Sequence, residues 1–525
     1  MNGSLRERAH AMHELALRYY IDLSDTQIGD VRVKNWNTTL AFLTYMTKGR
    51  HLLKGDPSTG KTSLSALVCS ILGGVPPDLA KRVLVRGTPD LTREDVTGRL
   101  QYGKLHEGKE WVVWNLAHTM PFFNLDELLR IPTKLQSLIL TGIEDGIWTY
   151  ASSYSIDVGK RPGFYTINPR DSGSFELTYA LMDRMTASSE HWPLPSVKQD
   201  EKDLANVLRD VELSGLLEKE DLPEGLQKLV RDVPSGVARS ITEQISRIGE
   251  ETTPPAEGMS NQRAFQETVK RVTELREKYR REILRPLLGG LEPLDEGDLD
   301  AILWEMRDIP FDPDAIKVRF WWEASMNTSG VYGRKRSEDH VSPTQIPDIY
   351  PDRNYAVSKV EGPLTNRVQG DANTYARAIA WWMGKESIDV ETYRTALVYC
   401  MNHRIPFDPL YAASNRWSPR KTDLQTHLSE LLLDEMSKDY QQVHGELFDI
   451  VGKVVRADFD PTIEEGEKGF DKGRMLTRRQ WDLVKEGKHP VVEQIRNHLD
   501  SEFGIYVERP WVKEYETLKG GEQED

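Results

Sequence analysis

The chain has 525 residues, of which 38% are hydrophobic and 29% are charged, a composition typical of a soluble globular protein with roughly two to four domains. Its formal charge of −15 argues against a protein that coats nucleic acid, although it leaves room for a local basic channel. Two cysteines are too few for a disulfide framework or a zinc site. The sequence shows no signal peptide and no apolar run long enough to cross a membrane, so we expect a cytoplasmic protein without membrane insertion.

Residues 1–50 are expected to be mainly helical, and they lead into a short apolar strand and a glycine-bounded loop. The loop fits the pattern G-x-x-x-x-G-K-[ST], in which inward-facing backbone N–H groups surround phosphate oxygens. In this pattern Lys61 would reach the β- and γ-phosphates, and the Thr62 hydroxyl would bind Mg²⁺. Apolar residues then recur at helical spacing as far as Gly73, which predicts a helix whose positive dipole end faces the anion. We therefore predict a nucleoside-triphosphate-binding loop made of Gly55, Asp56, Pro57, Ser58, Thr59, Gly60, Lys61, Thr62 and Ser63.

The next segments are expected to complete an α/β domain around this loop. An apolar run at 82–85 predicts a strand, and Thr92 with Asp95 forms the pattern of a helix N-cap. The stretch 101–115 indicates a hairpin or a loop-bearing insertion, and 147–157 predicts a second hairpin. This second hairpin fits a plain surface feature as well as a loop that projects into a central pore.

The stretch 120–127 is an apolar strand that ends in two adjacent carboxylates, Asp126 and Glu127. Alone, such a pair often marks only a helix N-terminus. Downstream of a P-loop it predicts a Mg²⁺ ligand followed by a residue that polarises the attacking water. Another strand, 163–167, ends at Asn168, which could orient the same water, although an Asn-Pro pair in isolation is simply a turn signal.

Taken together, these segments resemble the MoxR family of AAA+ ATPases. The resemblance rests on the P-loop, the acid pair, Asn168 and further segments at 87–100, 144–146, 173–185, 366–367, 377–380 and 403–405. It is close over 35–205 and looser over 345–406. It implies that Lys61 and Thr62 bind phosphate and Mg²⁺, with Asp126 as a second metal ligand. It also implies that Glu127 is the second catalytic acid and that Asn168 is the residue known as sensor 1.

Two arginines gain roles from the resemblance alone. Arg184, in the segment Asp-Arg-Met, resembles an arginine finger donated to the neighbouring subunit's site. Arg367 resembles the sensor 2 arginine of the helical lid, so it is added to the nucleotide-binding set. For each arginine the alternative is a surface salt bridge, which contributes little. The long separation between them departs from the family and predicts an insertion between the ATPase core and the lid.

The predicted fold is α/β: a P-loop AAA+ αβα domain with a parallel sheet, followed by a helical lid that carries a helical insertion and a helical C-terminal extension. The predicted domains are an N-terminal helical segment at 1–34, the nucleotide-binding domain at 35–205, the insertion at 206–340, the lid at 341–410 and the extension at 411–525.

The insertion is expected to contain a long amphipathic helix, with Phe265 and Tyr279 on its apolar face and many basic residues, including Arg276, Arg280 and Arg281. Its basic side fits a solvated helix face as well as a docking surface for an acidic partner or nucleic acid. Phe320 and the tryptophans at 321–322 and 381–382 are expected in the core.

The resemblance implies an ATPase that uses ATP and Mg²⁺ and works as a ring, most often a hexamer. Its task would be to remodel or assemble a protein partner, in the manner of a chaperone, and a von Willebrand factor A domain protein would be a typical partner. The alternative is an ATP-driven motor on nucleic acid, against which the acidic balance and the lack of a recognisable DNA-binding module argue. A scaffold that never hydrolyses ATP is a third reading, and the presence of Glu127 and Asn168 argues against it.

Overall fold

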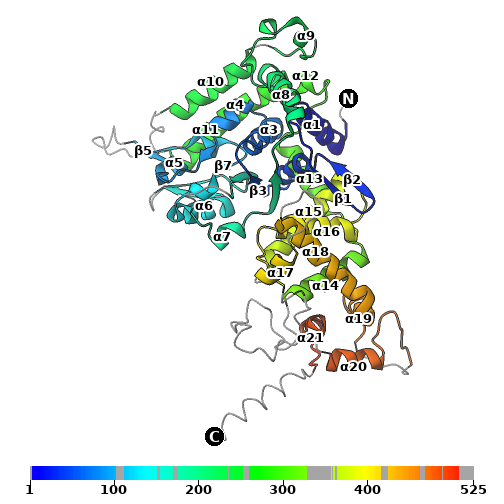
Figure 1. Ribbon diagram of the computed structural model, residues 1–525. Helices are drawn as coiled ribbons and strands as arrows, with labels where there is room; N and C mark the ends of the chain where they lie inside the picture. Colours follow the sequence, from blue (N-terminus) through cyan, green and yellow to red (C-terminus); the bar gives the residue numbers. More distant parts are fainter. Residues whose placement is uncertain are drawn as a thin grey trace. The chain divides into compact units, whose positions relative to one another are not determined.

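The structure, a computed structural model, describes residues 3–101, 111–150, 154–169, 175–234, 236–251, 259–327, 356, 359–360, 364–415, 424–461, 468–487 and 489–507 (Figure 1). The chain divides into two compact units. One comprises Met1–Asp308 with Arg377–Gly384, and the other comprises Ile309–Ala376 with Lys385–Asp525. Residues 206–308 therefore pack within the first unit, while the domain boundaries predicted at 205, 340 and 410 stay a prediction.

In the described residues of the first unit, helices surround a five-stranded sheet and three two-stranded antiparallel sheets. Its strands are β1 Asp25–Ile28, β2 Val31–Lys34, β3 Arg50–Gly55, β4 Val85–Arg86, β5 Gly98–Leu100, β6 Val112–Trp114, β7 Leu125–Asp126, β8 Ile147–Tyr150, β9 Tyr154–Asp157, β10 Gly163–Ile167 and β11 Ala187–His191. Its helices are α1 Leu5–Tyr19, α2 Trp36–Met46, α3 Lys61–Gly73, α4 Pro77–Arg82, α5 Arg93–Thr97, α6 Thr133–Asp145, α7 Tyr179–Met182, α8 Gln199–Glu212, α9 Glu224–Gln227, α10 Val237–Glu250, α11 Asn261–Tyr279, α12 Arg285–Leu287 and α13 Glu296–Arg307.

The central sheet has the strand order β11-β3-β10-β7-β4, and every neighbouring pair is parallel. All five residues of β10 are buried, as expected for a parallel strand covered on both faces. Helices α3, α4 and α11 lie on one side of the sheet and α6 and α7 on the other (Figure 1). The predicted αβα architecture with a parallel sheet is therefore confirmed. Since ligands of open α/β sheets bind beyond the carboxyl ends of the strands, this topology places the site after β3, β7 and β10.

Several hairpins and short elements that were predicted from local sequence can be compared with the structure. The predicted hairpin is present, with Tyr150 opposite Tyr154. β5 and β6 also pair antiparallel, and Thr92 with Asp95 forms a capping box at the start of α5. The strand predicted at 82–85 begins only at Val85, because Pro77 starts a helix that uses the residues up to 82.

Residues 1–50 are not wholly helical, because β1 and β2 form a hairpin between α1 and α2. Gly29, with φ of 59°, occupies the turn between these strands. A glycine followed by an aspartate between two β-branched runs is a hairpin signal that the prediction overlooked.

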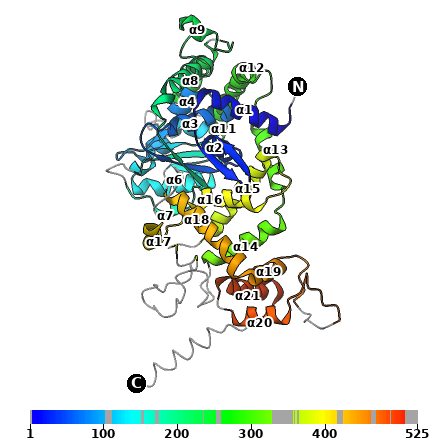
Figure 2. The ribbon, with the colours of Figure 1, turned by 45° about the vertical axis from the view of Figure 1, so that its right-hand side comes forward.

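The second unit is helical. It contains α14 Pro313–Asn327, α16 Val390–Met401, α17 Pro409–Ser414, α18 Leu424–Lys438, a π-helical turn η9 Asp439–Val443, α19 Gly445–Val454, α20 Arg478–Glu486 and α21 Pro490–Phe503. Helix α15 (Asn366–Met383) begins in this unit and ends in the first. Helices α14, α19 and α21 pack against one another, which both views show (Figure 2).

The tryptophan pairs lie in the core, as predicted, whereas Phe320 is only partly buried. Trp321 and Trp322 are fully buried in α14, and Trp381 and Trp382 are buried at the end of α15. Within the described ranges, no helix has both the length and the apolar character needed to traverse a membrane.

Candidate nucleotide-binding site

The loop after β3 depends on glycines whose backbone angles other residues rarely adopt. Gly55 has φ of 150° and Gly60 has φ of 90°. A Cβ atom on Gly55 would lie 2.4 Å from the carbonyl oxygen of His191, and one on Gly60 would lie 3.0 Å from the hydroxyl of Tyr20. Gly60 is the N-cap of α3 and brings no side chain to its first amides. These N–H groups can therefore serve a phosphate, which the positive end of the helix dipole also favours.

Lys61 lies at the centre of the loop. Its side chain is nearly buried, and its ammonium group donates to the carbonyl oxygens of Gly55 and Asp56 at 2.7 Å each and to Thr59 Oγ1 at 3.3 Å. Burial lowers the pKa of Lys61, and nearby carboxylates, Asp126 foremost, oppose that shift. The loop thus holds a positive charge among its backbone groups, where phosphate oxygens would compete for it.

A hydroxyl and a carboxylate meet beside the lysine. Thr62 Oγ1 donates to Asp126 Oδ1 at 3.1 Å, and Thr166 Oγ1 donates to the same oxygen. Asp126 ends β7 and Thr166 lies in the neighbouring strand β10. Mg²⁺ takes oxygen ligands, and one hydroxyl, one carboxylate and substrate phosphates form a fitting set. Of the residues described, Thr62 and Asp126 are those that would hold the ion in this site.

Glu127 has a strained backbone beside this pair. Its φ is 55°, a left-handed conformation that is uncommon outside glycine and that gathers at functional sites. Its backbone N–H donates to Thr166 Oγ1 at 3.0 Å, which holds the turn. Its carboxylate lies 3.2 Å from the guanidinium of Arg130, and the side chain is 47% exposed, so water can reach it. Asn168 follows Ile167, which pairs with Lys54 of β3, so it emerges at the same edge of the sheet.

Thr166 is a site residue that the sequence prediction missed. Its hydroxyl contacts both the Asp126 carboxylate and the Glu127 backbone, so it orients the two acids together. A signal was present, because side chains alternate along a strand and Thr166 therefore shares a face with Asn168. The prediction should therefore have included this threonine, which lies two positions before a candidate catalytic amide in an otherwise apolar strand.

The two predicted arginines lie in different units of the chain. Arg184 follows α7 in the first unit, and its Nε donates to Glu144 Oε2 at 2.6 Å. Arg367 lies in the first turn of α15, in the second unit. If Arg184 is not the finger, the arginines near the Asn168 strand, Arg161 and Arg170, are the alternatives. Arg161 donates to the backbone carbonyls of 117, 118 and 120, which makes it unsuited to reach another site, and Arg170 lies outside the described residues.

Arginines of the helical insertion hold the far end of the P-loop helix. Arg276 Nε donates to Gly73 O at 2.8 Å, and Arg280 donates to Leu72 O at 3.1 Å. Both guanidiniums pair with Glu296, and both arginine side chains are buried. The expectation of a solvated face or a docking surface was therefore wrong for Arg276 and Arg280, whereas Arg281 is exposed. Charges and carbonyls from segments far apart in the sequence meet here, which a helical pattern cannot reveal.

Comparison with known proteins supports the reading of the P-loop region. Residues 50–185 match the family profile of the AAA domain, dynein-related subfamily. The chain therefore carries an AAA domain. That region contains Lys61, Asp126, Asn168 and Arg184, whereas Arg367 lies beyond it. The match does not reach the finer level of the MoxR family, which stays a prediction.

Solved structures with related folds include a predicted ATPase from Cytophaga hutchinsonii, at 14% identity and a TM-score of 0.44, over 82% of this chain and 94% of that one. They also include a full-length MCM homolog from Methanopyrus kandleri, at 12% identity and a TM-score of 0.34, over 75% of this chain and 60% of that one. Both scores are low, so neither match adds to what the residues indicate. No curated protein matches the chain.

Proposed function

We propose that this protein is a MoxR-like AAA+ ATPase that hydrolyses ATP in a ring and uses the reaction to remodel or assemble a protein partner. The observation that carries the proposal is the contact of 3.1 Å between Thr62 Oγ1 and Asp126 Oδ1, beside the buried Lys61. A hydroxyl and a carboxylate at the edge of a phosphate-binding loop are the two protein ligands that Mg²⁺ takes in P-loop NTPases.

The chemistry follows from the positions of these groups. The P-loop amides and Lys61 would hold the phosphates, while bound Mg²⁺ would neutralise charge that develops on their oxygens. Glu127, exposed at the sheet edge, would polarise the attacking water, and Asn168 would orient it. Thr166 keeps the two acids in their relative positions through its two hydrogen bonds.

The ring and its partner belong to the same proposal. Its support is the AAA domain at residues 50–185 and the sequence resemblance described above. A hexamer would place Arg184 of one subunit at the site of the next, and Arg367 would close on the nucleotide from the lid. A von Willebrand factor A domain protein is the partner class to examine first. We propose a cytoplasmic setting on the same grounds.

The rival function, a motor on nucleic acid, loses part of its support from the sequence. That support was the basic side of α11 and of the turn after it, where Arg276 and Arg280 are buried against the end of α3 while Arg281 is exposed. The charges of Arg276 and Arg280 are satisfied by backbone carbonyls and Glu296, so they offer nothing to a phosphate backbone.

The test is a comparison of the wild type with Glu127→Gln. We expect the wild type to release phosphate from Mg·ATP, and the variant to bind Mg·ATP with similar affinity but to lose turnover. The variant should also accumulate in an ATP-dependent assembled form in sedimentation, and its trapped co-purifying protein would identify the client. Full turnover in Glu127→Gln, or a monomer at every ATP concentration, would contradict the proposal.

A further inference from the structure

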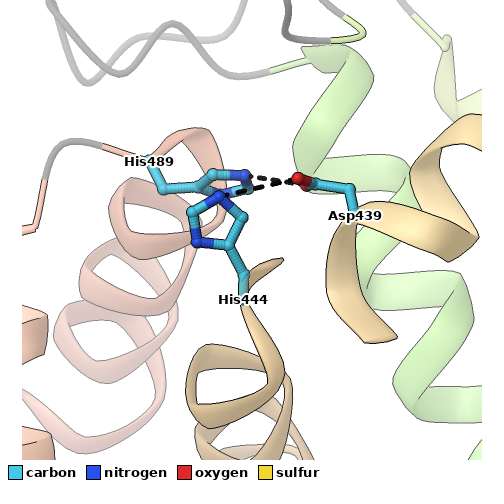
Figure 3. A group of neighbouring side chains, drawn as sticks. All are labelled: Asp439, His444 and His489. Carbon is cyan, nitrogen blue, oxygen red and sulfur yellow. Dashed lines mark hydrogen bonds and ion pairs between the residues drawn. The ribbon is translucent and has the colours of Figure 1, made fainter. Parts of the chain in front are cut away.

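Three side chains capable of binding a metal converge in the second unit, in a part of the protein that the proposed ATPase chemistry does not use. Asp439 lies at the start of the π-helical turn, His444 precedes α19 and His489 precedes α21 (Figure 3). In Figure 3 the two imidazole rings point toward the carboxylate of Asp439 from different helices. His489 is nearly buried, and the other two are partly exposed.

The π-helical turn brings two of these residues to the same side. The backbone N–H of His444 donates to the carbonyl oxygen of Asp439 at 3.0 Å, a bond between residues five apart. In an α-helix, residues five apart point about 140° away from each other, so a regular helix would separate the two side chains. Single π turns inside helices are rare and occur frequently at functional sites. Here the π turn brings the Asp439 carboxylate next to the His444 ring.

The spacing of the three groups fits a tetrahedral ion. Asp439 Oδ2 lies 3.2 Å from His489 Nε2, and Asp439 Oδ1 lies 3.5 Å from His444 Nε2. Around an ion with ligand bonds of about 2.0–2.1 Å, neighbouring ligand atoms of a tetrahedron are about 3.3 Å apart. The separation of 3.5 Å is long for a hydrogen bond but suits the edge of such a tetrahedron. The ligand atoms of all three residues lie within 4.8 Å of one another, so a small ring rotation would close the set.

We propose that Asp439, His444 and His489 form a binding site for a divalent transition-metal ion of the Zn²⁺ class. Two neutral imidazoles and one carboxylate suit Zn²⁺ better than Mg²⁺, which prefers oxygen ligands alone. The sequence prediction excluded a zinc site by counting cysteines, and this site uses none. The site is independent of the P-loop, so it stands or falls separately from the proposed ATPase function.

A cavity supplies access and room for a further ligand. It measures about 280 Å³ and is lined by Asp439 and His489 together with Lys359, Glu435 and other residues of the second unit. Three protein ligands with an open fourth position are typical of zinc sites that bind water or a small ligand. The buried Trp321 packs against both rings, at 5.1 Å from His489 and 6.4 Å from His444 between centroids. Trp321 therefore restricts the movement of the two rings, while the cavity reaches Asp439 and His489.

One contact must change when the ion binds. The backbone N–H of Val491 donates to His489 Nδ1 at 3.1 Å, so neutral His489 carries its proton on Nε2, facing Asp439. A metal at Nε2 requires the other neutral tautomer, with the proton on Nδ1, so the bond from the Val491 N–H would be lost. A single neutral hydrogen bond is weak compared with coordination of an imidazole to a transition metal. The arrangement therefore predicts that metal binding shifts the tautomer of His489 and loosens the N-cap of α21.

The test uses the full-length protein, treated with a chelator and free of nucleotide so that the P-loop contributes no metal site. Titration with Co²⁺ should give the visible ligand-field absorption of a tetrahedral complex, saturating at one equivalent and abolished when Zn²⁺ is added. His444→Ala and Asp439→Asn should weaken binding by at least about 100-fold, since losses of 10- to 100-fold follow from disturbing even outer contacts of a metal ligand. His489→Asn removes the imidazole but keeps an N-capping side chain, so it should behave likewise and remain folded.

The matched control is His427→Ala, which removes a histidine from α18 outside the cluster and should bind the metal as the wild type does. Zn²⁺ should raise the thermal unfolding temperature of the wild type and of this control but of none of the three site variants. Unchanged circular dichroism of each variant shows that it is folded. Absence of a one-equivalent complex in the wild type would overturn the proposal and leave a hydrogen-bonded cluster only. Binding that is equally tight in the site variants would overturn it too.

Discussion

Substitution of Glu296 by glutamine tests how the insertion supports the P-loop helix. Glu296 starts α13 and pairs with both Arg276 and Arg280, whose guanidiniums bond the last carbonyls of α3. Glutamine keeps the shape of the side chain and removes its charge. Two nearly buried guanidiniums would then share one end of a helix without the carboxylate that lies between them. We expect a clear loss of stability in the first unit.

The size of the effect follows from the pKa of this carboxyl. Burial alone would raise the pKa of Glu296, but Arg276 and Arg280 outweigh it and lower the pKa from 4.5 to about 2. If the whole pKa shift is converted, it corresponds to a contribution of about 3 kcal/mol to the free energy of unfolding. The side chain is 46% exposed, so solvent screening reduces the contribution, and we expect a loss of ~1–2 kcal/mol at neutral pH. Since the folded pKa is depressed, this stability is fully present above pH 4.5 and disappears as the pH falls toward about 2.

The assay is urea-induced unfolding followed by circular dichroism, with the transition of the first unit identified by its shift on adding ADP. The difference in the free energy of unfolding between the wild type and Glu296→Gln should be largest at neutral pH and should become smaller below pH 4.5. Glu277→Gln is the matched control, because Glu277 is an exposed partner of Arg280 alone and its loss leaves Glu296 in place. Equal losses in the two variants, or a difference that persists unchanged at low pH, would refute the reasoning.

Three further predictions concern the site itself. Lys61→Ala should lose ATP binding by calorimetry, because the phosphates lose the buried ammonium; normal affinity would contradict the P-loop assignment. Thr166→Val should lower kcat about 10- to 100-fold with little change in ATP affinity, because the acids lose their shared hydroxyl, whereas Thr166→Ser should retain turnover. Arg184→Ala should lose turnover by about 10³–10⁵ while binding ATP, and mixing it with Glu127→Gln should restore activity at mixed interfaces. Full activity of Arg184→Ala alone would exclude it as the finger.

The parts of the site that are local in sequence could be predicted. The loop at 55–62 carries its requirements in consecutive residues, and the helix that follows shows its apolar face directly. The acid pair was equally visible, because Asp126 and Glu127 end an apolar strand. The order of the strands, which joins these pieces, was not predicted. The prediction was a parallel sheet, and the parallel register of β10 with β3 and β7 confirms it.

The parts that depend on distant contacts could not be predicted. Arg276 and Arg280 look like an exposed basic face in a helical pattern, and only the folded chain shows Leu72 and Gly73 opposite them. The metal-binding cluster joins His489 to Asp439 and His444 of a π turn, a feature without a sequence signal of its own. The partner of Arg184 in this subunit, Glu144, could likewise have been any of several acids. In each case the missing information is which segment packs beside which.

The two ends of α3 explain why the insertion and the nucleotide site should be studied together. The N-terminus of this helix faces the P-loop, where its dipole favours an anion. Its C-terminus receives two guanidiniums from α11 and the turn after it, where the dipole favours cations. Both ends therefore have charges of the favourable sign, and α11 cannot shift without breaking these bonds or moving α3. The ATP affinity of Glu296→Gln should therefore be measured together with its stability. A changed affinity would show that the contacts of Arg276 and Arg280 at the C-terminus of α3 affect phosphate binding at its N-terminus.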